Sequence, residues 1–146
     1  MSVCTFFGHK ECYGLEEGAV AQAIEALIEQ GVDKFYVGHQ GQFDSTVLRC
    51  LLKLREVYSH ISFSVVLAYL PAQISGVDPY HGYSIYPEGI EAALPRFAIE
   101  RRNAWMITQA DYCLCYVHYA RGGAYKFARR AKQKGLVVIN LGSLSL

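Results

Sequence analysis

Residues 112–123 have the sequence YCLCYVHYARGG. The apolar run 112–117 predicts a buried strand, and the Gly122-Gly123 pair predicts a tight turn directly into a helix over 124–134. Parallel strands need such crossover helices, because the chain must return across one face of the sheet before the next strand begins. The segment therefore predicts an α/β fold.

The same alternation continues along the rest of the chain. Helical spacing predicts a helix over 15–30 and another over 95–109, after Pro95. It also predicts a helix that ends at Val57 and is capped by Asp44 or Ser45. Right-handed crossovers would place the helices on both faces of the sheet. We expect a Rossmann-like three-layer sandwich with a mainly parallel five-stranded sheet, formed as one domain by residues 1–146. The other four strands are expected over 3–7, 34–37, 61–70 and 136–141, with an irregular loop over 72–88.

Composition narrows the function classes. The chain has 146 residues, of which 52% are hydrophobic, enough to cover both faces of a sheet. A net charge of +1 provides no field to hold a polyanion, so nucleic acid is not expected as a partner. No stretch approaches the roughly 18 apolar residues of a membrane span, and we expect a cytoplasmic protein without a membrane partner. The five cysteines contain no C-x-x-C pair, which predicts buried thiols; neither a metal site nor a cofactor is expected.

Three predicted strands end in similar loops, at Gly8-His9-Lys10, at Gly38-His39-Gln40-Gly41 and at 118–123. In parallel sheets, ligands bind outside the carboxyl ends of the strands. Glycine lets backbone amides approach a ligand, and Gly122-Gly123 opens a helix whose free N–H groups accept phosphate. The predicted ligand-binding residues of these loops are Gly8, His9, Lys10, Gly38, Gly41, Gly122 and Gly123. The alternatives are tight turns without a ligand and, for Lys10, a solvated loop charge.

The helix after Pro95 gives a second clue, because Asn103 shares an apolar stripe with Ile99 and Met106. A buried amide needs partners. In one interpretation, Asn103 makes a hydrogen bond to a loop backbone and Arg102 is a surface arginine. In the other, Asn103 and Arg102 both reach the phosphate or sugar of a ligand. In the ligand interpretation Arg102 is largely solvated, and Arg102→Ala changes stability by only about 0.5 kcal/mol. In the opposing interpretation Arg102 braces the loops around Asn103.

The carboxylate Asp44 also has two interpretations. It caps the predicted helix, or it holds ribose hydroxyls at the end of a strand. Tyr80, Tyr83 and Tyr86 either pack the long loop down or form an aromatic wall against a base.

The segment 102–106, followed by Ala110-Asp111, a strand and Gly122-Gly123, resembles the SLOG superfamily, which includes the LOG phosphoribohydrolases. Further segments are similar to the small bacterial SLOG proteins of the YpsA-like type: Gly38 with 41–44, 95–99, and 139–140. The resemblance implies a Rossmann-like fold and a pocket for a nucleotide or nucleotide-derived molecule. Together with the apolar Phe97 and Trp105, it also suggests a homodimer.

The sequence departs from the LOG hydrolases at their catalytic glutamate. Tyr125, Lys126 and Arg129 stand where those enzymes have Gly-Thr and the glutamate. A positioned carboxylate contributes roughly 10²- to 10⁴-fold to such a reaction, so hydrolysis by that route is not expected. Binding of a nucleotide-type ligand is the first hypothesis. The alternative is a nucleoside-monophosphate N-glycosidase in which Glu100, Asp44 or Glu88 substitutes, and a partner-binding protein with a vestigial crevice is a third.

Overall fold

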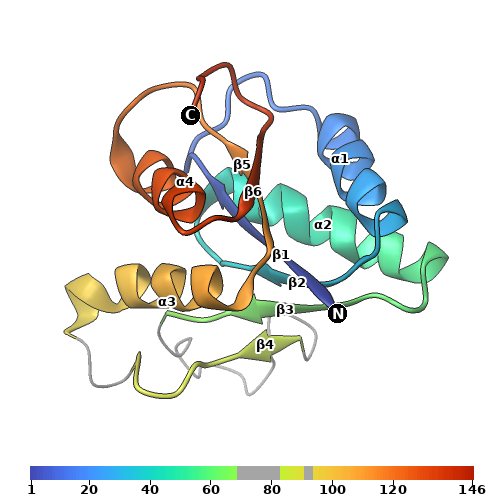
Figure 1. The fold of residues 1–146 in the computed structure, drawn as a ribbon, viewed down its shortest axis with the longest axis horizontal. Helices are drawn as coiled ribbons and strands as arrows, with labels where there is room; N and C mark the ends of the chain where they lie inside the picture. The colour runs from blue at the N-terminus through green and yellow to red at the C-terminus, as the bar shows by residue number, and fades with distance from the viewer. Residues whose placement is uncertain (69–82, 91–93) are drawn as a thin grey trace.

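The computed structural model describes residues 1–68, 83–90 and 94–146. Within these residues it is an α/β sandwich of a parallel sheet and flanking helices (Figure 1). The strands are β1 (Ser2–Gly8), β2 (Val32–Val37), β3 (Ser62–Val66), β4 (Ser84–Ile85), β5 (Tyr112–Tyr116) and β6 (Val137–Asn140). The helices are α1 (Glu17–Glu29), α2 (Gly41–Val57), α3 (Pro95–Gln109) and α4 (Gly122–Gln133).

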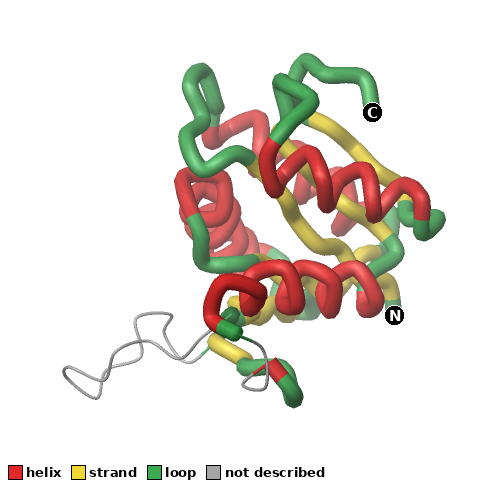
Figure 2. The backbone as a smooth tube through the Cα atoms, turned by 90° about the vertical axis from the view of Figure 1, so that its left-hand side faces the viewer, coloured by secondary structure: helices red, strands yellow, loops and turns green. Residues whose placement is uncertain are grey.

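The six strands lie in the order β4-β3-β2-β1-β5-β6, and each neighbouring pair is parallel. Strands β2, β3 and β4 therefore extend to one side of β1, and the chain then returns to place β5 and β6 on the other. Helices α1 and α2 pack together on one face, whereas α3 and α4 cover the other. Figure 2, viewed from the side of α3 and α4, shows these two helices in front of the strands.

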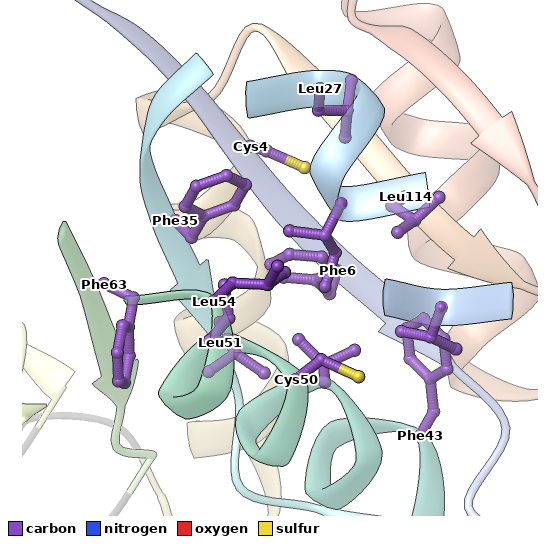
Figure 3. Close-up of a cluster of buried hydrophobic side chains, with 14 of the residues drawn as sticks. Cys4, Phe6, Leu27, Phe35, Phe43, Cys50, Leu51, Leu54, Phe63 and Leu114 are labelled. Atoms are coloured by element: carbon purple, nitrogen blue, oxygen red, sulfur yellow. The ribbon is translucent and has the colours of Figure 1, made fainter. Parts of the chain in front are cut away.

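Side-chain alternation along β1 fills a core on each face of the sheet. Cys4 and Phe6 belong to the cluster beneath α1 and α2 (Figure 3), and Phe7 belongs to the cluster beneath α3 and α4. The Phe7 ring stacks on Phe127 of α4 with centroids 5.7 Å apart. Burial of each such aromatic or branched side chain contributes about 1.5–3 kcal/mol to stability, so both helix layers are held on the sheet by hydrophobic packing.

The predicted Rossmann-like sandwich is confirmed, but the strand count differs by one. The extra strand is β4, which lies inside the segment that the sequence predicts to be irregular. It pairs with Val65 and Val66 of β3. Two residues are too few to display a period of two, so the pairing is set by tertiary contact alone. Tyr80 lies outside the described residues.

Helix α2 also begins earlier than predicted. Its first residue is Gly41, and neither Asp44 nor Ser45 is its N-cap. The Asp44 carboxylate instead reaches back to accept the backbone N–H of Gln40 at 2.9 Å, and the Ser45 hydroxyl donates to the Gly41 carbonyl. A carboxylate in the first turn satisfies a helix-terminal N–H without occupying the cap position itself.

Three further findings concern the described part of the chain. Its cysteines are free thiols, and all of them are buried, as predicted. No group of three or more His, Cys, Asp or Glu side chains there is placed to hold a metal ion. None of the helices seen there has both the length and the apolar character required to cross a bilayer.

Candidate functional site

The candidate site lies where the strand order reverses. Strands β1 and β5 are neighbours in the sheet, yet β1 leads into α1 on one face and β5 leads into α4 on the other. Gly8 pairs with Tyr116, so the two strands end at the same level. Connections that leave in opposite directions open a crevice outside the strand ends, which is where open α/β sheets bind ligands.

A cavity of about 390 Å³ occupies this crevice. It is lined from β1, from the start of α2, from one side of α3, and from the loop that enters α4. The lining residues are Phe6, Phe7, Gly8, His9, Lys10, Gln40, Asp44, Ile99, Arg102, Asn103, Met106, Tyr119, Arg121, Gly122, Gly123 and Ala124. Of the predicted ligand-binding residues, Gly38 and Gly41 lie outside this lining.

The N-terminus of α4 borders the cavity. Gly122 has a φ of +87°, a conformation that favours glycine, and a Cβ at Gly122 or Gly123 would meet no atom within 4 Å. Arg121 occupies the N-cap position and makes no side-chain capping bond. The first amides of α4 therefore have neither an intrahelical acceptor nor a side-chain cap, and with the helix dipole they favour an anion.

Two exposed cations line the cavity. Lys10 follows β1, and the Arg121 guanidinium lies 5.2 Å from the centre of the Tyr119 ring. The Tyr119 ring in turn stacks on His9, with centroids 4.0 Å apart and planes within 8°. Cation, tyrosine and histidine form one wall, which combines positive charge with an aromatic surface.

His9 is buried in this wall with a defined tautomer. Its Nε2 accepts the backbone N–H of His118 at 2.9 Å. A backbone N–H can only donate, so the proton of the neutral ring is on Nδ1. Burial lowers the pKa of His9, and the neighbouring His118 lowers it further. His9 is therefore a neutral hydrogen-bond donor, not a further positive charge.

Arg102 is the main correction to the sequence interpretation. It is only 2% exposed, whereas the ligand interpretation expected a largely solvated side chain. Its Nε donates to Asn103 Oδ1 at 2.7 Å, and its Nη1 donates to the Val66 carbonyl at 3.1 Å. The guanidinium thus links α3 to the end of β3. These bonds favour the interpretation in which Arg102 braces the structure around Asn103.

Asp44 lies near enough to this guanidinium to feel its charge. A Cβ on Gly38 would lie 2.8 Å from Asp44 Oδ2 and 2.9 Å from Arg102 Nη1, so both groups close over Gly38. Burial raises the pKa of Asp44 to about 6, while the charge of Arg102 and the Gln40 N–H act to lower it. His39, which follows Gly38 in the sequence, is neutral, since burial and the charge of Arg102 lower its pKa to about 4. Its Nε2 accepts the Ala68 N–H.

Close packing explains why the loops after β1 and β2 contain glycine, because a side chain at these positions would clash with its neighbours. A Cβ on Gly8 would lie 2.2 Å from the Phe43 ring, and one on Gly41 would lie 2.6 Å from the Lys10 Cα. Gly41 also has a φ of +84°. With Gly38 closed over by Asp44 and Arg102, the open glycines at this end of the sheet are Gly122 and Gly123.

Several sequence candidates lie away from the cavity. Glu100 is on the exposed side of α3 in an ion pair with Lys126, which lowers the pKa of Glu100. Glu88 is exposed as well. Tyr83 stacks on Phe63 at 4.3 Å and Tyr86 packs beside Ile90, so neither lines the cavity. Of the proposed carboxylates, Asp44 is the one in the lining.

Sequence reasoning missed two wall residues and one supporting residue. Tyr119 and Arg121 belong to the loop that precedes the glycine pair. For Arg121 the sequence did contain a signal, because an arginine stands at the start of a turn predicted to bind an anion. Asn140 holds the end of β5: its Oδ1 accepts the Val117 and Gly142 N–H groups, and its Nδ2 donates to the Val117 and Leu144 carbonyls. Nothing in the spacing of a short strand indicates that role.

No protein-family model matches the chain, and no curated protein matches it significantly.

Proposed function

We propose that the protein binds a nucleotide or nucleotide-derived small molecule in the cavity between β1 and β5, with a phosphate at the N-terminus of α4. The observation that carries this proposal is the position of the uncapped, open Gly122-Gly123 turn in that cavity. Backbone amides at a helix start complement phosphate oxygens in geometry and in charge.

The remaining lining supports the same ligand class. Lys10, Arg102 and Arg121 contribute three positive charges against the single carboxylate of Asp44, so the cavity favours an anion. Tyr119 offers an aromatic surface, and Ile99 and Met106 offer apolar ones. A volume of about 390 Å³ falls in the usual range for small-molecule sites. A phosphate joined to a sugar and a base matches this combination of charge and apolar surface.

Calorimetry with AMP, adenosine and inorganic phosphate tests the proposal. AMP is expected to bind more tightly than adenosine, because adenosine lacks the group that α4 and the cations recognise. Increasing salt should weaken AMP binding, since exposed charges contribute to it. Absence of saturable binding by any nucleotide at millimolar concentration would refute the proposal.

Gly123→Ala is expected to separate ligand binding from folding. The added methyl group meets no protein atom within 4 Å, and alanine is better than glycine in a helix by about 1 kcal/mol, so stability should be unchanged or slightly higher. The same methyl group narrows the approach to the α4 amides, and AMP affinity should fall about tenfold, or about 1.4 kcal/mol. Melting temperature and calorimetry on one sample measure both effects. Unchanged affinity would place the phosphate elsewhere.

A second candidate function is hydrolysis of a nucleoside monophosphate at its N-glycosidic bond. The observation that favours it is Asp44, a buried carboxyl group in the cavity lining with a pKa raised to about 6. Such a group suits a general base that activates water or an anion that stabilises the sugar cation. The bond from C1′ to the base would break, water would supply the new oxygen at C1′, and the base would leave with a proton.

For this reaction Asp44 must be ionised, so the rate should rise with pH through about 6 and level off above it. Asp44→Asn should lower the rate by roughly 10²-fold or more. Chromatographic detection of adenine released from AMP measures both effects, with Glu100→Gln as the control variant. Base release that survives Asp44→Asn would contradict this role.

We also propose, from the residues that carry the resemblance, that the chain is a SLOG-type protein of bacterial origin and cytoplasmic location. A homodimer is part of the same proposal. Phe97 is exposed on α3, whereas Trp105 is half-buried with its ring 5.1 Å from that of Tyr36. Phe97 is therefore the more available of the two for a contact between copies. Sedimentation as a monomer at micromolar concentration would contradict the dimer.

A further inference from the structure

Asn103 lines the cavity, and one end of its side-chain amide is fixed by a hydrogen bond within the protein. Its Oδ1 accepts from Arg102 Nε at 2.7 Å. A guanidinium has no acceptor, so the atom facing it must be oxygen, and the amide cannot be flipped without placing two donors against each other. The amino group Nδ2 is therefore directed away from Arg102.

This amino group has no hydrogen-bond partner among the residues that the structure describes, although Asn103 is only 8% exposed. In that same part of the chain, the one fully enclosed side-chain atom without a partner is Oδ1 of Asp33. The Nδ2 of Asn103 is thus not sealed in the core. Because Asn103 lines the cavity, its donor is available to a molecule bound there.

Arg102 is itself fixed, and this makes it suitable for holding Asn103. Its Nη1 is bonded to the Val66 carbonyl, and the guanidinium packs over Gly38, where a Cβ would lie 2.9 Å from that same Nη1. At 2% exposure it has little freedom to change rotamer. A rigid donor at Nε keeps Asn103 Oδ1 occupied, so the ligand meets N–H and not a carbonyl.

His9, another residue of the cavity lining, shows the same arrangement. Its acceptor Nε2 is occupied by the His118 N–H, which leaves Nδ1–H as its other polar atom. Both polar side chains therefore use their acceptors internally and keep donors. With the α4 amides they form a lining that matches a ligand rich in acceptor oxygens.

We propose that Asn103 is a specificity-determining contact that donates from Nδ2 to an acceptor oxygen of a phosphate ester, and that Arg102 is the positioning residue that orients it. The inference rests on the proposed function and specifies how the same site selects its ligand. It assigns Arg102 an indirect role: the arginine orients the group that contacts the ligand.

Asn103→Asp tests the contact while preserving the bond to Arg102. Aspartate has nearly the same shape, and its carboxylate accepts from Arg102 Nε at least as well as the amide does. It lacks the donor and adds a negative charge facing the ligand. The melting temperature should be equal to or higher than that of the wild type, whereas affinity for AMP, measured by calorimetry, should fall about 100-fold or more.

Asn103→Ala and Arg101→Ala provide the matched comparisons. Asn103→Ala removes both the acceptor for Arg102 and the donor to the ligand, so melting temperature and AMP affinity should both fall. Arg101 is the exposed neighbour of Arg102 on α3, and its replacement should change neither quantity.

The outcomes distinguish this inference from the proposed function. If the wild type binds AMP and Asn103→Asp binds it equally well, the contact is refuted and the proposed function stands. If Asn103→Asp melts as low as Asn103→Ala, Arg102 does not hold Asn103 as described, and the positioning role is refuted. If the wild type binds neither AMP nor inorganic phosphate, the proposed function and the contact are refuted together.

Discussion

Arg102→Ala is expected to lower the free energy of unfolding by about 3–5 kcal/mol, because it removes two hydrogen bonds of a buried charged group, each worth about 1.5–3 kcal/mol. The variant loses the bonds to Asn103 Oδ1 and to the Val66 carbonyl, and it leaves the Asp44 carboxylate buried without its neighbouring cation. For a chain of this size the melting temperature should fall by roughly 10 °C.

Urea unfolding of Arg102→Ala beside Arg101→Ala measures this effect at two adjacent positions of α3. Arg101 is exposed, and its replacement should stay within about 0.5 kcal/mol of the wild type. A difference below about 1 kcal/mol between the two variants would restore the solvated-arginine interpretation. Because the stability loss does not depend on a ligand, this result is independent of whether any nucleotide binds.

The position of Arg102 shows where sequence reasoning about the site stops. Helical periodicity placed Asn103 on the buried stripe and located α3 between Pro95 and Gln109, as the structure has it. Periodicity assigns a residue to a side of its own helix, but not to what packs there from elsewhere. The Val66 carbonyl is 36 residues away in sequence, and only the crossing of α3 over the end of β3 brings it within reach.

The fold itself was predictable because its signals are local and repeated. Each strand with more than three residues has an apolar run, α1, α2 and α4 each have an apolar stripe, and Pro95 marks the start of α3, so element type and order follow from pattern. β4 lacks this signal, since it is a two-residue strand whose formation depends on its pairing with β3. The site was predictable in outline for the same reason: β1 and β5 end in glycine-containing loops, and parallel strands bring those loops together.

What the sequence could not provide is the reason for each glycine. Gly8, Gly38 and Gly41 look like Gly122 and Gly123 in the sequence, and all five were predicted to bind the ligand. In the structure the space beside the first three is filled by Phe43, by the side chains of Asp44 and Arg102, and by the Lys10 backbone. Open and closed glycines differ only in long-range packing, which single-sequence patterns do not encode.

Gly8→Ala is therefore expected to destabilise the fold by about 3 kcal/mol or more, at the upper end of what overpacking usually costs. The new Cβ would lie 2.2 to 2.4 Å from three atoms of Phe43. Phe43 is fully buried, and its ring stacks on Tyr116 at 6.2 Å, so it has no free volume into which to move. Relief requires a shift of β1 against α2, at the end of the strand that borders the cavity.

Chemical denaturation of Gly8→Ala beside Gly123→Ala checks this expectation, because both changes add one methyl group to a glycine in the cavity lining. The first should lose stability, and the second should keep or gain it while losing AMP affinity. If Gly8→Ala instead folds normally and weakens AMP binding, Gly8 serves the approach of a ligand to its backbone, as the sequence interpretation held. The change in stability is expected to have opposite signs at the two positions. The comparison therefore distinguishes a glycine required for packing from a glycine that leaves room for a ligand.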